Sequence, residues 1–193
     1  MGNIFFTSDL HFGHANILRY DNRPFESVEE MDYELVRRWN ERVSPEDTVY
    51  VLGDVSWYDA DKTKQLVSSL NGRKILIRGN HDKPGNGKIW GFDEEYDYKE
   101  IRPNGKKSLV VLSHYPITFF NRHHYGAYML YGHVHATHEW NITENVKRQL
   151  ERLDIPCNMF NVGCMLWDYA PVTLEEIIAD QRFQKEQPEG TEV

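Results

Sequence analysis

The chain has 193 residues and a formal net charge of −8, so it lacks the basic footprint expected of a protein that binds long nucleic-acid duplexes. Its composition, with 40% hydrophobic and 13% aromatic residues, is ordinary for one globular domain with a sizeable core. No apolar run approaches ~20 residues, so we expect no membrane span, and the first residues lack the features of a secretory signal. Two cysteines, Cys157 and Cys164, are too few for a disulfide framework and favour a reducing cytoplasm.

Strands and helices alternate in the first half of the chain. Apolar runs predict strands over residues 3–8, 48–52 and 74–78, and apolar residues at helical spacing predict helices over residues 28–43 and 60–70. Ser27 and Glu30 have the spacing of a capping box at the start of the first helix, and Asn71-Gly72 is a stop signal after the second. The glycine-rich residues 83–91 are expected to form a loop.

The second half of the chain is richer in strands. We expect strands over residues 96–102, 108–112, 127–131 and 159–162, with the first two paired through a turn at Asn104-Gly105. Residues 142–153 predict an exposed helix, Thr173 and Glu176 mark the capped start of a short helix, and the polar residues 183–193 predict a frayed tail. These elements predict a single α/β domain over residues 1–182 with layered, mixed sheets.

Five short polar clusters follow the apolar runs. They are Asp9-Leu10-His11, Gly53-Asp54, Gly79-Asn80-His81-Asp82, Ser113-His114 and Gly132-His133-Val134-His135. Open α/β sheets bind ligands in loops at the carboxyl ends of strands, so we expect the clusters to converge. Their carboxylate, imidazole and amide groups suit Mn²⁺, Fe, Zn²⁺ or Ni²⁺ better than Cu⁺. Each cluster alone is explained at least as well by an ordinary turn or cap, but the five together predict a site for two divalent metal ions.

The order of these clusters resembles that of the calcineurin-like metallophosphoesterases, from residue 9 to about residue 162, and within that family the small single-domain bacterial or phage group. The resemblance implies a layered β-sandwich of two mixed sheets flanked by helices. It also implies two ligand sets: Asp9, His11, Asp54 and His135 for one ion, and Asp54, Asn80, His114 and His133 for the other, with Asp54 bridging. His81 resembles the catalytic histidine of the family, and Asp82 the residue that orients it.

The resemblance also implies how such a site cleaves a phosphoester. Two divalent ions ~3.5–4 Å apart lower the pKa of a shared water, which gives a bridging hydroxide as nucleophile, and they stabilise the oxygens of an in-line displacement. His81 protonates the leaving group or stabilises charge on the phosphoryl oxygens, and general acid catalysis typically contributes ~10²–10⁴-fold. We expect Mn²⁺ as the cofactor, with Fe, Zn²⁺ or Ni²⁺ as alternatives.

Six further residues are candidates for substrate contact. His14 and Asn16 follow the first cluster, Arg19 and Arg23 flank Tyr20, and Arg122 and His123 lie between the fourth and fifth clusters. Arginines beside an aromatic ring can grip a phosphate and stack on a base. The alternative for His14 is a helix cap, and the alternative for the two arginines is a solvated loop.

The leading interpretation is a metal-dependent phosphodiesterase that acts on small or exposed phosphodiesters such as nucleotides, because the chain carries no obvious cap domain to restrict its active site. A phosphomonoesterase is a second possibility. A nuclease is disfavoured by the acidic charge, and an inactive scaffold is disfavoured because His81 and every ligand of the motif set are present. The expected partner is therefore a small phosphoester rather than a membrane, and the sequence leaves the oligomeric state open.

Overall fold

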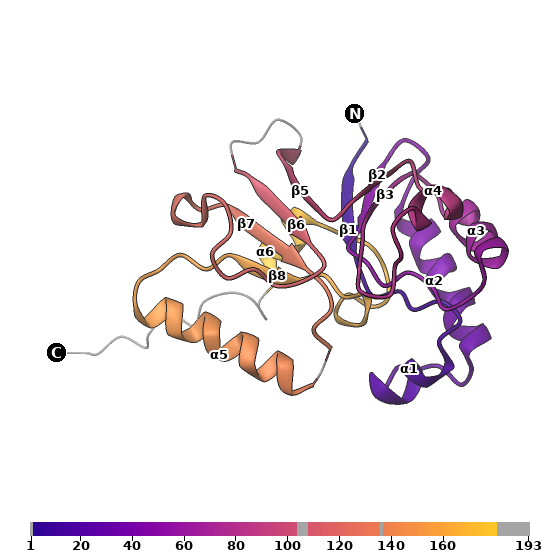
Figure 1. Ribbon diagram of the computed structural model, residues 1–193, viewed down its shortest axis with the longest axis horizontal. Coiled ribbons are helices and arrows are strands. Elements are labelled where there is room, and N and C mark those ends of the chain that lie inside the picture. Colours follow the sequence, from indigo (N-terminus) through magenta and orange to yellow (C-terminus); the bar gives the residue numbers. More distant parts are fainter. Residues whose placement is uncertain (1, 104–107, 136, 181–193) are drawn as a thin grey trace.

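Two β-sheets pack together in the computed structural model, which describes residues 2–103, 108–135 and 137–180 (Figure 1). The first has the order β4 (Glu94–Tyr96), β3 (Arg73–Ile77), β2 (Thr48–Val51), β1 (Ile4–Thr7) and β9 (Val172–Thr173). The second has the order β5 (Tyr98–Ile101), β6 (Val110–Ser113), β7 (Tyr128–Tyr131) and β8 (Met159–Asn161). β9 and β5 are antiparallel to their neighbours and the other pairs are parallel. Both sheets are mixed, which confirms the predicted fold.

The helices are α1 (Ala15–Tyr20), α2 (Val28–Arg42), α3 (Ala60–Ser69), α4 (Asn86–Trp90), α5 (His138–Arg152) and α6 (Leu174–Ala179). α2 and α3 lie on the first sheet and α5 lies beside the second (Figure 1), whereas the buried residues of α6 join the core between the sheets. Trp39 of α2 and Val67 of α3 are buried in the core beside the first sheet, and Leu150 of α5 is buried beside the second. Phe6 and Leu112 share the core between the sheets, where a fully buried side chain of this kind contributes roughly 1.5–3 kcal/mol.

The predicted helix starts are confirmed by their caps. The Ser27 hydroxyl accepts from the backbone N–H of Glu30 at 3.1 Å, while the Glu30 carboxylate reaches back to Glu26 rather than to Ser27. At α6, Thr173 and Glu176 form the complete capping box. Each cap satisfies backbone N–H groups that have no partner inside the helix.

Residues 83–91 do not form the plain loop that the glycines predict, because they contain α4. The backbone N–H groups of Gly85 and Gly87 donate to the Glu95 carboxylate at 2.9 and 2.6 Å. These bonds hold the first turn of α4 against β4. The glycines therefore begin a short helix here, through a carboxylate that lies outside the segment.

The strand predicted over residues 96–102 is two strands in different sheets. Tyr96 of β4 pairs with Ile77 in the first sheet, and Tyr98 of β5 pairs with Ser113 in the second, so the chain crosses between the sheets at Asp97. The predicted pairing of this segment with the next strand is confirmed for β5 and β6.

The helix α5 begins four residues before its predicted start at residue 142, because the Thr137 hydroxyl caps it by accepting from the Glu139 N–H. The helix α1 and the strand β9 were not predicted. The turn at Asn104-Gly105 and the tail over residues 183–193 lie outside the described residues.

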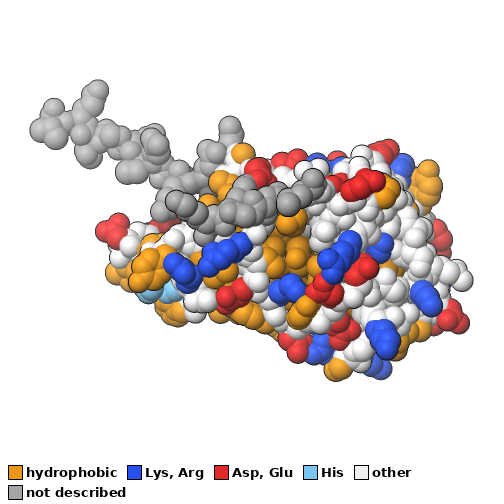
Figure 2. All heavy atoms as spheres, turned by 90° about the horizontal axis from the view of Figure 1, so that it is seen from above, with side chains coloured by type: hydrophobic (Ala, Val, Ile, Leu, Met, Phe, Trp, Pro, Cys, Tyr) orange, Lys and Arg blue, Asp and Glu red, His pale blue; other side chains and the backbone are white. Residues whose placement is uncertain are grey.

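The surface agrees with the absence of a basic footprint. On the face seen in Figure 2, Lys and Arg side chains are interspersed with Asp and Glu, and ion pairs such as Arg42 with Glu176 at 2.5 Å join neighbouring elements. Within the described part of the chain, no helix is both long and apolar enough to cross a bilayer. Cys157 and Cys164 are buried and unpaired with each other.

Two glycines with similar backbone angles test how tightly the turns are packed. Gly72 has φ +82°, and a Cβ there would lie 2.9 Å from the Asp47 carbonyl oxygen, whereas Gly85 has φ +86° and open space around it. Gly85→Ala is expected to lower the free energy of unfolding by about 1 kcal/mol through backbone strain. Gly72→Ala is expected to cost about 1–3 kcal/mol more, because the methyl group also clashes. Urea unfolding at 25 °C measures both, and equal costs would contradict tight packing at Gly72.

Candidate metal centre

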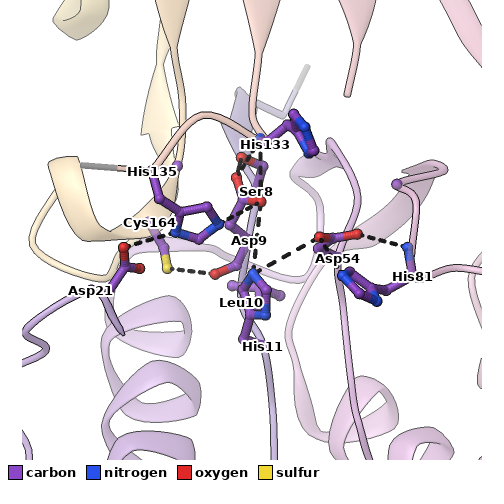
Figure 3. Close-up of polar contacts among 12 residues, drawn as sticks. Ser8, Asp9, Leu10, His11, Asp21, Asp54, His81, His133, His135 and Cys164 are labelled. Carbon is purple, nitrogen blue, oxygen red and sulfur yellow. Dashed lines mark hydrogen bonds and ion pairs between the residues drawn. The ribbon is translucent and has the colours of Figure 1, made fainter. Parts of the chain in front are cut away.

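The polar clusters lie at or just beyond the carboxyl ends of β1, β2, β3, β6 and β7. The side chains of Asp9, His11, Asp54 and His135 point toward one another (Figure 3). The backbone N–H of Asp9 donates to the Gly53 carbonyl at 3.0 Å, which joins the loops after β1 and β2. The N–H of Gly132 donates to the His114 carbonyl at 3.0 Å, which joins the loops after β6 and β7. The convergence expected from the sequence is therefore built by backbone hydrogen bonds between loops.

Four of the predicted ligands have left-handed backbone conformations. The φ angles are 56° at Asp9, 55° at His11, 54° at Asp54 and 65° at His133. This region is uncommon for residues other than glycine and costs of order 1–3 kcal/mol per residue. Such strain persists only where surrounding contacts hold it, and it is typical of functional sites.

Two motif glycines are required by the close approach of backbone to carboxylate. A Cβ at Gly79 would lie 2.2 Å from Asp54 Oδ1, and a Cβ at Gly132 would lie 2.5 Å from Asp9 Oδ2. Any other residue at either position would displace a carboxylate that faces the site.

A first group of possible ligand atoms comes from Asp9, His11 and His135, and these atoms all lie within 4.8 Å of one another. The Nε2 atoms of His135 and His11 lie 3.6 and 3.9 Å from Asp9 Oδ1. His11 Nε2 is buried and has no hydrogen-bond partner. A buried nitrogen without a partner is costly in a protein interior, and a divalent cation would satisfy it. The residues present therefore fit a metal ion.

A second group comes from Asp9, Asp54 and His114, again within 4.8 Å. His114 Nε2 lies 3.7 Å from Asp54 Oδ1 and 3.0 Å from the side-chain oxygen of Asn80. The ring of His133 lies edge-on beside His114, with the ring centres 5.0 Å apart. The backbone N–H of His133 donates to the Asp9 carboxylate at 3.1 Å.

Burial and charge set the protonation of these groups. Burial lowers the pKa of His11 well below its usual value, which keeps the imidazole neutral, the form that binds metal. Burial alone would raise the pKa of Asp9, but hydrogen bonding to His135 and the neighbouring histidines lower it below its ordinary range. Burial would lower the pKa of His135, yet hydrogen bonds with Asp21 and Asp9 raise it to about 10. The site thus combines an ionised carboxylate with imidazoles of contrasting proton affinity.

The sequence did not identify Asp21, which holds His135 in place. Asp21 Oδ1 lies 2.8 Å from His135 Nδ1, and this contact leaves Nε2 facing Asp9. The other Asp21 oxygen accepts from Arg23 Nε and Nη2, both at 3.2 Å. Outer carboxylates of this kind fix the orientation of metal-binding histidines. The only sequence signal is the polar run of residues 20–23 after the first cluster.

Arg23 is not a substrate-binding residue, contrary to the sequence-based expectation. Its guanidinium is fully buried and donates to the carbonyl oxygens of Asp9 at 2.8 Å and Leu10 at 3.0 Å. With these bonds and Asp21, the side chain supports the loop after β1 from beneath. Its neighbour Arg19 is exposed and lies over the Tyr20 ring.

The expectation that Asp82 orients His81 is also wrong. The Asp82 carboxylate accepts from the backbone N–H groups of Asp54 and Gly79, each at 2.8 Å, and of Val55 at 3.2 Å. All its described bonds therefore tie the loop after β2 to the loop after β3. The position of Asp54 depends on this link.

Trp57 is the residue that packs against His81, with ring centres 4.4 Å apart. It also stacks on His11 at 4.5 Å and on His14 at 4.2 Å. His14 precedes α1 but makes no side-chain cap, so the capping alternative is wrong. His14 lies beside the metal-binding group instead, with its Nδ1 3.3 Å from that of His11. Asn16 is exposed on α1.

Arg122 and His123 lie away from the site, so the structure does not support them as substrate-binding residues. The Arg122 carbonyl accepts from Ala127 N–H at 3.3 Å, and Tyr128 N–H donates to the Leu109 carbonyl at 2.9 Å. The two residues therefore sit at the amino end of β7, whereas the site lies at its carboxyl end. The segment between the parallel strands β6 and β7 has to return to the opposite edge of the sheet.

Comparisons with known proteins agree with this geometry. The family model described as calcineurin-like phosphoesterase matches residues 2–167. An uncharacterized protein of Methanocaldococcus jannaschii is 37% identical over 182 residues, covering 92% of this chain and 90% of its own length. The gene 66 protein of Mycobacterium phage L5 is 34% identical over 167 residues, covering 70% of this chain and 79% of its own. A solved protein of unknown function from Aquifex aeolicus has a TM-score of 0.70 and 29% identity, covering 92% of this chain and 98% of that chain.

Removal of the Asp21 carboxylate tests its role in holding His135. We expect Asp21→Ala to weaken Mn²⁺ binding by about 10–100-fold, the usual effect of losing an outer hydrogen-bond partner of a metal ligand. Competition with a fluorescent chelator measures the affinity. Asp61→Ala, at an exposed position on α3, is the matched control and should bind Mn²⁺ as the wild type does. An unchanged affinity in Asp21→Ala would contradict the role.

Proposed function

Because the chain belongs to the calcineurin-like phosphoesterase family, we propose that it is a phosphodiesterase that uses two divalent metal ions. The observation that carries the proposal is the placement of the Asp54 carboxylate. Its Oδ2 lies 3.9 Å from His11 Nε2, and its Oδ1 lies 3.7 Å from His114 Nε2. One carboxylate that faces two separate histidines is suited to bridging two ions.

The proposed ligands of one ion are Asp9, His11, Asp54 and His135, and those of the other are Asp54, Asn80, His114 and His133. This set of carboxylate, imidazole and amide groups is one that Mn²⁺ accepts, along with Fe, Zn²⁺ and Ni²⁺, and Mn²⁺ is our first choice. When bound, such a pair lowers the pKa of a water and offsets charge on the phosphoryl oxygens. Two cysteines are too few for a disulfide framework, which fits our proposal that the enzyme works in the reducing cytoplasm.

His81 is the proposed proton donor to the leaving oxygen. Its side chain is 50% exposed, and its Nε2 lies 4.0 Å from Asp54 Oδ2, so it stands at the mouth of the site rather than within it. Its backbone N–H donates to Asp54 Oδ1 at 3.1 Å, which fixes the backbone from which the side chain extends. As the bond from water to phosphorus forms and the bond to the leaving oxygen breaks, His81 supplies the proton that this oxygen needs.

Two features support a diester rather than a monoester. The partly exposed rings of Trp57 and Tyr115 lie on different sides of the site, one against His11 and the other against His114. The site is thus open on both sides, as two ester groups require. A monoester carries a second negative charge near neutral pH, and the buried Arg23 guanidinium is turned away and cannot neutralise it.

Hydrolysis of bis-p-nitrophenyl phosphate and p-nitrophenyl phosphate tests the proposal directly. Metal-stripped protein is re-supplied with Mn²⁺, Ni²⁺ or Zn²⁺, and metal content is measured by mass spectrometry. We expect metal-dependent turnover of the diester and two ions per chain. Turnover of the monoester alone would make the protein a phosphatase. One ion per fully active chain would contradict the bridging role of Asp54.

His81→Ala separates the proton donor from the metal ligands. We expect turnover of the diester to fall by about 10²–10⁴-fold, the usual contribution of general acid catalysis, while two ions remain bound. His138→Ala, at an exposed position on α5, is the control and should keep full turnover. Loss of metal from His81→Ala would show that His81 is a ligand instead.

A further inference from the structure

An aromatic strip leads outward from His81 across the surface beside the metal centre. It is formed by Trp57, His14 and Tyr20. Trp57 lies 4.4 Å from His81 between ring centres, His14 stacks on Trp57 at 4.2 Å, and Tyr20 meets His14 edge-on at 6.4 Å. The exposed Arg19 guanidinium lies over Tyr20, 5.3 Å from its ring centre. The strip therefore begins at the proposed proton donor and ends at a cation.

Three imidazoles pack around the Trp57 indole, and two of them, His11 and His14, share one face. His11 and His14 lie nearly parallel to it, at interplanar angles of 24° and 10° and distances of 4.5 and 4.2 Å. Their own ring centres are only 5.4 Å apart, far less than the sum of those two distances. Both imidazoles therefore lie on the same face of the indole. With His81 also packed against it, Trp57 is still 37% exposed, so part of the indole is open to contact with a flat group.

The backbone holds Trp57 in this position. Its N–H donates to the Phe12 carbonyl at 2.8 Å, and a parallel bridge joins Phe12 to Ser56. The loops after β1 and β2 are thus fixed side by side, with Trp57 on one and His14 on the other. Tyr20 is 62% exposed at the end of α1. These backbone contacts therefore fix the positions of Trp57 and His14 within the strip.

We infer that this strip is a stacking subsite for a nucleoside on the leaving side of a phosphodiester, an inference that rests on the proposed function. Every nucleobase has a flat face that stacks on aromatic side chains, whatever its sequence. The contact between Trp57 and His81 places that base next to the group that protonates the leaving oxygen. Tyr20 then offers a second stacking position, and Arg19 a positive charge for the next phosphate. The substrate class is a dinucleotide or short single strand.

Two phosphodiesters with alcohol leaving groups test the subsite on the Mn²⁺-loaded protein. Thymidylyl-(3′,5′)-thymidine carries bases, and glycerophosphoethanolamine does not. Chromatography of the released alcohols gives kcat/KM for each. We expect the wild type to prefer the dinucleotide by about tenfold or more, the size expected for one base stack. In Trp57→Ala this ratio should fall about tenfold, mainly through KM, and Trp57→Phe should retain it.

Three results would overturn the inference. If Trp57→Ala lowers kcat/KM equally for both substrates, Trp57 only positions His11 and His81. If the wild type cleaves bis-p-nitrophenyl phosphate but shows no preference for the dinucleotide, the base subsite is wrong while the phosphodiesterase proposal stands. If no diester is cleaved with any metal, both fail.

The outer end of the strip is tested with a trinucleotide. Tyr20→Ala should lower kcat/KM for the trinucleotide severalfold more than for the dinucleotide. Tyr125→Ala is the matched control, because Tyr125 is also exposed but lies just before the amino end of β7, on the far side from the site. It should change neither value. An equal effect of Tyr20→Ala on the two lengths would overturn the second stacking position.

Discussion

Burial of the Asp9 carboxylate is the constraint on which the rest of the site depends. A carboxylate removed from water is costly unless polar groups surround it, and Asp9 is 0% exposed. Its carboxylate accepts from the Ser8 hydroxyl and the His133 backbone N–H, and its carbonyl oxygen accepts from Arg23 and the Cys164 thiol. These partners come from the loops after β1, α1, β7 and β8. The His133 N–H that compensates for the buried charge therefore also joins the loop after β7 in the second sheet to the loop after β1 in the first.

Hydrogen bonds between loops also hold the strained backbone conformations of the site. Asp9, Asp54 and His133 have left-handed backbone conformations that residues other than glycine rarely adopt. Each is held by a hydrogen bond with a group from a different loop. The Asp82 carboxylate is central to this, because it accepts N–H groups from both sides of the gap between β2 and β3. These hydrogen bonds thus hold the ligands in conformations that their own backbone preferences disfavour. A rigid set of ligands lowers the reorganisation needed when a cation binds.

The sequence predicted the clusters but not the contacts between them. Each cluster is a contiguous run after a strand, so strand prediction and residue chemistry suffice to find it. The sequence did not predict the role of Asp82, because its partners are backbone N–H groups that no side-chain pattern reveals. Asp21 was not predicted, because its contact with His135 depends on how the segment after α1 lies against the loop after β7. His123 was misplaced because position between two motifs says nothing about which end of a parallel sheet a connection visits.

An acidic protein that acts on an anionic substrate has to bind it through contacts at the active site, because its overall charge repels the substrate. Binding to a long duplex draws its free energy from many phosphates and released counterions, and a net charge of −8 opposes that. A single phosphodiester requires positive charge at one point only, which the proposed metal pair supplies. Stacking on Trp57 and Tyr20 adds affinity that carries no charge and so is indifferent to the acidic surface. The acidic composition therefore argues against a duplex-binding nuclease but leaves room for a nucleotide substrate, because overall charge measures long-range attraction and not the fit of one site.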